Sequence, residues 1–322
     1  MNVSQITIVV CTYNRSVMLR DALRSLYDLR TAGEFSYEIL VVDNNSSDDT
    51  PQIIEQCRRE SRATLRGVRE TKPGVAAARN RGVCEARGEW IAFFDDDQIA
   101  DSDWLYELRR GVLEQQCRIV GGAVHLLLPE GCQRDLDPFC RMLLGESRWS
   151  EVPQQYNHRI NPGAGNLMVE KSIFDEVGLF NEALRRGEDT DLYRRTRAAG
   201  MVAWYLPAAI IHHMTPDDRL TDAYLLKLSR NMGDLLAVHE WNTRSTLLAA
   251  ATWVAKTGRA IALQWPRQQF MRLLGLTEAE LGARCKLSLS AGHFGHGWSR
   301  IAEKLAARKP VRATTVASRP IA

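Results

Sequence analysis

Short apolar runs alternate with amphipathic segments of helical length over the first hundred residues. The runs are too short for helices and rich in β-branched and aromatic residues, which predicts strands at residues 6–11, 37–42, 64–68 and 90–94. Between them, apolar residues at helical spacing predict helices after Ser16, from Pro51, and in an alanine-rich segment that ends at Gly88. Strands separated by helices predict βαβ units and a parallel sheet.

Beyond residue 100 the pattern predicts more sheet and then a helical end. Apolar runs predict strands at residues 119–128, 165–169, 201–206 and 208–211, with short helices at 172–179 and 189–199. The irregular segment 131–161 is expected to form a loop or a lid over the site. We therefore expect an α/β domain at 1–220, a helical C-terminal extension at 221–304, and a disordered basic tail at 305–322.

Polar clusters follow three of the predicted strands. They are Thr12-Tyr13-Asn14, Asp43-Asn44-Asn45 and Asp95-Asp96-Asp97. Ligands of parallel sheets bind beyond the carboxyl ends of the strands, so these clusters predict one shared site. The carboxylates of Asp95 and Asp97 repel one another unless a cation is present, and their oxygens suit Mg²⁺ or Mn²⁺. The alternative is a solvated acidic turn.

Composition and cysteine usage narrow the class of protein. Hydrophobic residues make up 45% and charged residues 25% of the chain, which excludes disordered and collagen-like classes for most of it. The first residues lack the basic stretch, apolar run and cleavage site of a secretory signal. The seven cysteines are odd in number and contain no CxxC pair, which favours reduced thiols. We therefore expect a cytoplasmic protein.

The charge is unevenly distributed along the chain. From Arg244 to the end, 13 Lys and Arg face three acids, whereas the preceding part is acidic. Such an end suits a membrane surface or a phosphate-bearing lipid, or it is simply solvated. The apolar stretch 246–265 is interrupted by Lys256 and Arg259, which excludes a membrane span. Trp253 and Trp265 fit a helix in the interface of the inner face of the cell membrane, and equally a helix packed on the α/β domain.

Six motifs resemble those of one known family. In chain order they are VVCTYNR, VVDNNSSDDT, AAARNRG, FFDDD, GAGN and GEDTDL, and they look like those of the family-2 glycosyltransferases of the GT-A fold. The resemblance covers about two-thirds of the chain, residues 6–213. It implies a Rossmann-like, mostly parallel sheet flanked by helices, and transfer of a sugar from a nucleoside diphosphate to an acceptor with the help of Mn²⁺ or Mg²⁺.

The resemblance also implies a site for the donor. Thr12 and Asp43 would bracket the base and the ribose, with Asn14 beside them, and Arg79 would lie near the nucleotide. Two alternatives stay open. Asp43 could only close an Asx turn, and Arg79 could be an exposed arginine on a helix.

The same resemblance assigns the metal. Asp97 would ligate the ion that bridges the diphosphate, and Asp95 would face the ribose or the metal. Several GT-A enzymes complete this site with a histidine at the point of the chain where His212 and His213 stand. A histidine at a strand end is also an ordinary structural residue, and the sequence does not decide between the two.

A second acidic motif implies the base. Asp189 best matches the residue that deprotonates the acceptor hydroxyl, with Glu188 as the second candidate and Asp191 as a structural acid. Acids at a helix start are also common helix-capping residues. Gly165 and Asn166 would form a wall of the donor or acceptor pocket, or simply a turn before a strand.

These expectations combine into one function. We expect an inverting glycosyltransferase that uses a nucleoside-diphosphate sugar, with UDP the commonest nucleotide of the family, in polysaccharide or glycoconjugate biosynthesis. The acceptor would be a glycan, a lipid-linked glycan or a small molecule. The alternatives are a sugar nucleotidyltransferase and a non-catalytic nucleotide-sugar-binding protein. The first usually has a glycine-rich loop after its first strand, where this chain has CTYNRSVML. Nucleic acid is not expected as a partner, since the basic residues are confined to the tail.

Overall fold

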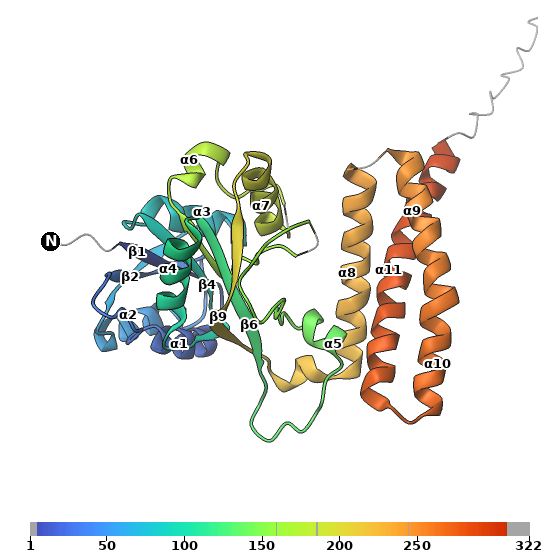
Figure 1. Ribbon diagram of the computed structural model, residues 1–322, viewed down its shortest axis with the longest axis horizontal. Coiled ribbons are helices and arrows are strands. Elements are labelled where there is room, and N and C mark those ends of the chain that lie inside the picture. The colour runs from blue at the N-terminus through green and yellow to red at the C-terminus, as the bar shows by residue number, and fades with distance from the viewer. Residues whose placement is uncertain (1–4, 159, 185, 244, 308–322) are drawn as a thin grey trace, which may run out of the picture. The chain divides into compact units, whose positions relative to one another are not determined.

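The computed structural model describes residues 5–307 except 159, 185 and 244, and the chain divides into two compact units. The first unit, Met1–Gly131 with Gly145–Pro216, carries the sheet and its flanking helices (Figure 1). The second unit, Cys132–Leu144 with Asp217–Ala322, is mostly helical over the residues that the structure describes.

Within the described residues, nine strands of the α/β unit form one sheet in the order β3-β2-β1-β4-β8-β6-β9-β5, with β7 paired to β9. The strands are β1 Ile6–Thr12, β2 Tyr37–Asp43, β3 Thr64–Arg69, β4 Trp90–Asp95, β5 Gln98–Ala100, β6 Ile119–Leu127, β7 Gln154–Gln155, β8 Asn166–Glu170 and β9 Ala203–Met214. Strands β3, β2, β1 and β4 are parallel, as the alternating pattern predicts. Strand β8 runs antiparallel to both β4 and β6, so the second half of the sheet is mixed.

Helices cover both faces of this sheet. They are α1 Ser16–Ser25, α2 Thr50–Glu60, α3 Val75–Glu85, α4 Trp104–Gln115, α6 Ile173–Val177 and α7 Glu188–Ala198. Ile8 and Val10 of β1 pack in one core cluster with α1, α2 and α4, whereas Val9 packs in the other with α3, α6 and α7. Because successive side chains of a strand point to opposite faces, a strand buried on both sides requires an unbroken apolar run.

Strand β9 joins the two apolar runs that the pattern separates. Its pairing with β6 shifts register between Gly122 and Ala123, where Leu206 and then Ile210 are the partners. Pro207 lies in the bulge, and it has no N–H to donate to a neighbouring strand. A side chain at Gly122 would place its Cβ 2.0 Å from the carbonyl oxygen of Ala209, so only glycine permits this approach.

The helical unit is built on two long helices. Its elements are α5 Pro138–Leu143, the 3₁₀ helix η1 Asp217–Leu220, α8 Asp222–Thr243, α9 Thr246–Arg259, the π-helical segment η2 Ala260–Gln264, α10 Trp265–Leu273 and α11 Thr277–Ala307. Helices α8 and α11 approach closely at Gly233 and Gly292. A Cβ at either glycine would lie within 2.0 Å of a backbone oxygen of the other helix.

The segment 131–161 differs from its prediction. Cys132–Leu144 belongs to the helical unit and contains α5, where the sequence predicts an irregular loop or lid of the α/β domain. Arg134 holds it there, donating to Asp222 Oδ1 at 2.7 Å and to Glu278 Oε1 at 2.9 Å. A six-residue helix is too short for its period to be recognised.

The structure describes only the first three residues of the predicted C-terminal tail. Residues 305–307 form the end of α11, whereas residues 308–322 of the predicted disordered tail lie outside the described residues. Among the described helices, none is long and apolar enough to cross a membrane.

Candidate functional site

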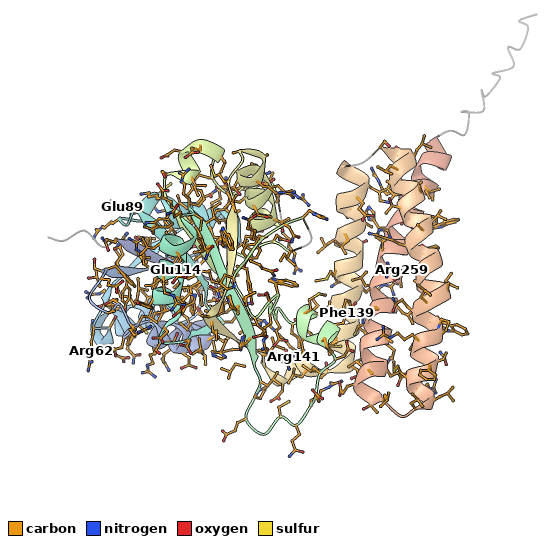
Figure 2. The ribbon with its side chains drawn as sticks, viewed as in Figure 1. Arg62, Glu89, Glu114, Phe139, Arg141 and Arg259 are labelled. Carbon is orange, nitrogen blue, oxygen red and sulfur yellow. The ribbon has the colours of Figure 1, made fainter. Side chains whose placement is uncertain are left out.

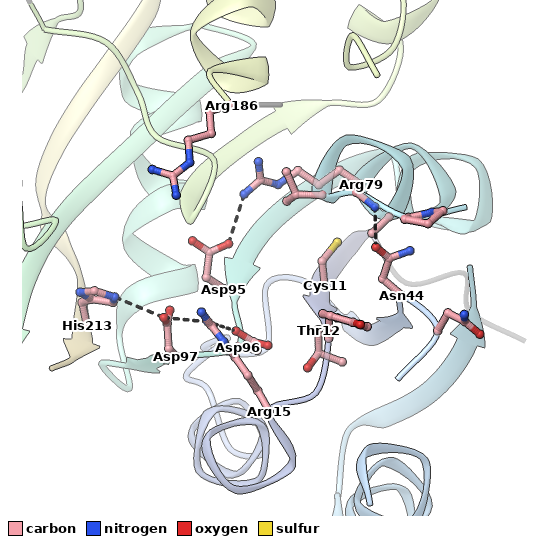
Figure 3. A pocket seen from close by; sticks show the side chains of 16 residues that line it. Cys11, Thr12, Arg15, Asn44, Arg79, Asp95, Asp96, Asp97, Arg186 and His213 are labelled. Atoms are coloured by element: carbon pink, nitrogen blue, oxygen red, sulfur yellow. Dashed lines mark hydrogen bonds and ion pairs between the residues drawn. The ribbon is translucent and has the colours of Figure 1, made fainter. Parts of the chain in front are cut away.

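A cavity of about 890 Å³ opens at the carboxyl ends of β1 and β4 (Figure 3). The residues that line it include Cys11, Thr12, Arg15, Asn44, Arg79, Asp95, Asp96, Asp97, Arg186 and His213. Parallel pairing places Thr12 beside Asp43 and Cys11 beside Asp95, so these strands end at one edge. All three polar clusters of the sequence therefore contribute residues to the region of this cavity.

Arg15 joins two carboxylates of the acidic turn. Its Nη1 lies 2.8 Å from Asp96 Oδ1 and 2.9 Å from Asp97 Oδ2. Burial raises the pKa of Asp96 to about 6, although the guanidinium opposes this. The sequence alone assigns no role to either Asp96 or Arg15. The only sequence signal for Arg15 is that it follows Thr-Tyr-Asn at the end of the first strand.

The antiparallel pairing of β5 with β9 decides between the two histidines. Gln98 pairs with His213, whose Nε2 lies 3.4 Å from Asp97 Oδ2. The next residue along the strand, His212, packs edge-on against His125 with the ring centroids 5.7 Å apart. Of the two predicted candidates, only His213 therefore lines the cavity.

The donor set of the acidic turn fits a divalent cation. Among the described residues, no group of three His, Cys, Asp or Glu side chains is already arranged as a metal site. Asp97 and His213 nevertheless converge, Asp95 lines the same cavity, and Nδ1 of His213 is buried without a hydrogen-bond partner. Mg²⁺ is commonly held by one or two carboxylates, with phosphate oxygens and water completing its shell. In this structure the guanidinium of Arg15 pairs with Asp97 and with the neighbouring Asp96.

Arg79 links the two acidic motifs. It is only 7% exposed, its Nη1 forms an ion pair with Glu188, and its Nη2 lies 3.3 Å from Asp95 Oδ1. Burial alone would lower the pKa of Arg79, but Asp95, Cys11 and Glu188 raise it, so the group stays charged. Arg79 is therefore not the exposed helix arginine of the alternative interpretation.

The loop Gly163-Ala164-Gly165 lies between Asp95 and Asp189. A Cβ at Gly165 would lie 2.4 Å from Asp95 Oδ2, whereas one at Gly163 would lie 4.0 Å from Asp189 Oδ2. Asp189 accepts from the backbone N–H of Ala164 at 3.4 Å. Gly165 thus leaves room for the Asp95 carboxylate, and the loop contacts the candidate base.

The three acids at the start of α7 have different partners. Glu188 is buried against Arg79, and Asp191 accepts from Arg195 Nε at 2.9 Å. Asp189 is half-buried, and its Oδ1 accepts from the N–H of Thr190 at 2.6 Å. Within the described residues, Asp189 is the one of the three without an ion pair to an arginine.

Asn166 has a structural role that the sequence does not reveal. Its Nδ2 donates to the carbonyl oxygens of Ala123 and Ala209, and its Oδ1 accepts from Trp104 Nε1 at 2.8 Å. Both amide donors are used, and the residue is buried. The side chain therefore ties β8 to its neighbours instead of contacting a donor in the cavity.

Two further predicted donor residues also hold loops in place. Asp43 Oδ1 accepts from the N–H of Ser46 at 2.9 Å, which is the Asx turn of the alternative interpretation. Asn14 accepts from the N–H of Ser47 at 2.8 Å and so connects the loops after β1 and β2. Neither is among the residues that line the cavity, whereas Thr12 is.

Arg186 and Cys11 were not predicted as site residues. Arg186 precedes Gly187, whose φ of +82° turns the chain into α7, and its guanidinium lies over the cavity near Asp95 (Figure 3). Burial raises the pKa of Cys11 to about 12, so its thiol stays protonated. Cys11 is therefore a wall of the cavity and not a nucleophile.

A cavity lined by three acids and by the buried Arg79, at the carboxyl edge of a half-parallel α/β sheet with helices on both faces, is typical of the GT-A fold. Residues 7–130 match the family model described as "Glycosyl transferase family 2". This part of the α/β unit is thereby identified as family-2 glycosyltransferase sequence.

Known proteins of similar sequence include the following three. The succinoglycan biosynthesis protein ExoM of Rhizobium meliloti is 27% identical over 69% of this chain and 71% of its own length. Glycosyltransferase AglE of Haloferax volcanii is 27% identical over 61% of this chain and 62% of its own length. A β-1,3-glucosyltransferase of Campylobacter jejuni that acts on GalNAc(5)-diNAcBac-PP-undecaprenol is 29% identical over 37% of this chain and 38% of its own length.

Solved structures support the fold. A mannosyltransferase from Pyrobaculum calidifontis, determined in complex with GDP-Man and Mn²⁺, superposes with a TM-score of 0.60 at 16% identity, covering 94% of this chain and 89% of that one. TarS of S. aureus, residues 1–349, superposes with a TM-score of 0.50 at 17% identity, covering 93% and 92%.

Proposed function

We propose that this protein is an inverting, metal-dependent glycosyltransferase that moves a sugar from a nucleoside-diphosphate sugar to an acceptor hydroxyl. The observation that carries the proposal is the convergence of Asp95, Asp97 and His213 with the buried Arg79 at the carboxyl edge of the sheet. The diphosphate of a nucleoside-diphosphate sugar is stabilised by positively charged side chains and by a divalent metal ion, and carboxylates of this kind can ligate that ion.

The donor would lie along the β1 edge of the cavity. Thr12 lines it there, and Arg79 is close enough to Asp95 to hold that carboxylate toward the ribose or the metal. A bound Mn²⁺ or Mg²⁺ would offset the charge that develops on the leaving diphosphate. Asp97 and His213 would hold it, and Arg15 would then be released from Asp97 to meet a phosphate oxygen.

The candidate base is Asp189. A base must be free to accept the proton of the acceptor hydroxyl, and the charge of Glu188 is already matched by Arg79. Asp189 borders the loop 163–165, whose other end contacts Asp95. A base that activates the acceptor for direct attack on the anomeric carbon supports inversion. Glu188 then acts as a positioning residue for Arg79.

Two relatives support a proposal for the acceptor. One relative acts on an undecaprenol-linked glycan and another takes part in succinoglycan biosynthesis. We therefore propose a glycan or lipid-linked acceptor, used in polysaccharide or glycoconjugate assembly on the cytoplasmic side of the cell membrane. UDP is the first nucleotide to test, and GDP, which is bound in the Pyrobaculum structure, is the second.

Calorimetric titration tests the donor site directly. The purified chain is titrated with UDP, dTDP and GDP, each with Mn²⁺ and each with EDTA. Binding of one nucleotide that depends on Mn²⁺ is the expected result and identifies the donor class. If a folded protein binds none of the three, the transferase proposal is abandoned in favour of a non-catalytic role.

A further inference from the structure

The outer helices of the helical unit expose large apolar side chains. Leu247, Val254 and Ile261 follow one another at intervals of seven residues and are 85%, 60% and 66% exposed. This spacing places the first two on one face of α9. Phe270 and Leu273 of α10 are also exposed, at 57% and 84%. Scattered apolar residues on a surface need no explanation, but a series along consecutive helical segments marks an interaction surface.

The same segment carries positive charge and no negative charge. Residues 245–276 contain four Lys and Arg and no Asp or Glu. No described helix can span a bilayer, so this segment cannot bury its apolar residues by crossing one. A helix with exposed apolar residues and only basic charges matches a surface that offers both hydrocarbon and phosphate.

A cavity of about 230 Å³ lies within the helical unit beside this segment. The side chains that line it include Phe139, Lys256, Arg259, Gln264, Lys286 and His293. Glu240 is paired with Lys256, and its Oε2 lies 2.9 Å from His293 Nε2. Within the described residues, Arg259 and Lys286 have no carboxylate partner, and the Lys286 ammonium lies over the Phe139 ring at 5.3 Å. Two cations of the cavity are therefore left without a compensating charge.

The π-helical segment η2 carries residues of both the cavity and the exposed apolar surface. Pro266 has no N–H, so the helix cannot make its usual hydrogen bond at this point, and the preceding residues Ala260–Gln264 widen into η2. Arg259 directly precedes this segment, Gln264 is its last residue, and both line the cavity. Ile261, within the same segment, is exposed. The buried Oε1 of Gln264 has no hydrogen-bond partner. Figure 2 shows Arg259 on the bundle and Phe139 on α5.

We propose that α9, η2 and α10 dock on an anionic lipid bilayer, with Arg259 and Lys286 receiving a lipid phosphate. The exposed apolar side chains would enter the interface, where their burial favours binding. The unpaired guanidinium and ammonium would form charge-assisted hydrogen bonds with the phosphate. This inference goes beyond the transfer reaction and does not depend on it, because its test measures binding to vesicles.

Flotation of the full chain with vesicles tests the docking. One set of vesicles contains phosphatidylcholine alone, and the other contains phosphatidylglycerol at about one-third of the lipid. We expect the protein to float with the anionic vesicles, to stay behind with the neutral ones, and to be released by high salt. Equal binding to both vesicle types, or to neither, overturns the proposal.

Matched variants locate the phosphate site. Arg259→Gln with Lys286→Gln is expected to weaken binding to anionic vesicles at least about tenfold, since each cation near a charged membrane contributes about fivefold. The control, Lys227→Gln with Arg230→Gln, removes the same charge from exposed positions of α8 that do not line the cavity. If both pairs weaken binding equally, the cavity is not the phosphate site.

A second pair of variants tests the apolar face. Leu247→Ser, Ile261→Ser and Leu273→Ser together should abolish flotation. Val17→Ser, Leu113→Ser and Val152→Ser, which change apolar residues of the α/β unit that are also more than half exposed, should not. Size-exclusion chromatography of the unmodified chain accompanies this test. A stable dimer that the first variant converts to a monomer would show that a second copy, and not lipid, covers the face.

Discussion

Charged side chains in and around the cavity of the α/β unit are linked by ion pairs, so that each carboxylate of this set has a positively charged partner or a histidine beside it. Arg15 holds Asp96 and Asp97, Arg79 holds Asp95 and Glu188, and Asp97 also faces His213. A change of one member therefore exposes the charge of another, and the effects of single substitutions differ in kind. Some should remove binding, and others should remove only the chemical step.

Asp97→Ala should abolish Mn²⁺-dependent nucleotide binding, because it removes the carboxylate that faces His213 in the cavity. His213→Ala should weaken that binding by a smaller factor. His212→Ala is the matched control, since its ring packs against His125 outside the cavity and binding should not change. Calorimetric titration with Mn²⁺ measures all three. Unchanged nucleotide affinity in Asp97→Ala would remove Asp97 from the metal site.

Asp189→Asn should lower kcat by about 10²–10⁴-fold, because the amide cannot accept the proton of the acceptor. The dissociation constant of the donor should stay nearly unchanged. Asp191→Asn is the control. Asp191 lies two residues further along α7 and is paired with Arg195, so this variant should keep most of the activity. Steady-state kinetics with calorimetry separate the two effects. Loss of donor binding in Asp189→Asn would assign it to the donor site and not to catalysis.

At the scale of elements, the loop before β8 separates Asp95 from Asp189. The loop before β8 contacts both Asp95 and Asp189, and β8 itself is anchored by Asn166. Strand β8 runs antiparallel to β4, so the beginning of β8 lies beside the acidic end of β4. The site therefore depends on a strand that carries no charged side chain into it.

Gly165→Ala should weaken donor binding strongly while the protein stays folded. The new Cβ would lie 2.4 Å from Asp95 Oδ2 and 2.6 Å from Gln98 Nε2, so both side chains must move. Gly163→Ala, whose Cβ would meet Asp189 Oδ2 at 4.0 Å, should be tolerated. Circular dichroism and nucleotide titration of both variants provide the comparison. Equal donor affinity in the two would mean that Asp95 is not needed at its present position.

Asn166→Ala should destabilise the α/β unit by about 2–4 kcal/mol, because two carbonyl oxygens and the Trp104 N–H lose their buried partner. Asn161→Ala removes only a partly buried contact with Thr190 and should cost less than about 1 kcal/mol. Urea denaturation measures both. A stable Asn166→Ala protein with impaired donor binding would restore the role that the motif implies.

At the scale of the whole molecule, the chain holds two units with separate apolar clusters. The α/β unit has one cluster on each face of its sheet, and Ala237, Trp241 and Ala249 form a small one in the helical unit. The α/β unit contains the buried ion pair of Arg79 with Glu188, and the helical unit contains the pairs of Glu240 with Lys256 and His293. We therefore expect two thermal transitions by calorimetry, and they should respond differently to pH.

Acid should lower the transition of the helical unit through Glu240. Burial raises the pKa of this carboxyl, but the hydrogen bonds from Lys256 and His293 more than compensate, and the pKa lies below its usual value of 4.5. A lowered pKa contributes stability above that value, and the contribution is lost as the pH falls through the folded-state pKa. The transition should therefore drop between about pH 5 and pH 3. In Glu240→Gln this part of the drop should be absent, and an identical pH profile would contradict the assignment.

The local pattern of the sequence was sufficient for the first half of the α/β unit. Period-two and period-3.6 spacing is a property of neighbouring residues, so β1 to β4 lie within a residue or two of their predicted ranges, and the alanine-rich helix α3 ends three residues before Gly88. Because parallel strands end at one edge, the sequence also predicted that Thr12, Asp95 and Asp97 would meet. Three of the six family motifs, VVCTYNR, VVDNNSSDDT and FFDDD, occupy those strand ends.

Only the tertiary structure decided which of the remaining polar residues enter the cavity. His212 and His213 are adjacent in sequence, and the pairing of β9 with β5 determines which one faces Asp97. Asn166 and Gly165 are adjacent too. Gly165 lies against Asp95, whereas the side chain of Asn166 donates to the carbonyl oxygens of Ala123 and Ala209. Pairing partners, strand direction and burial are long-range properties, and no spacing within a motif encodes them.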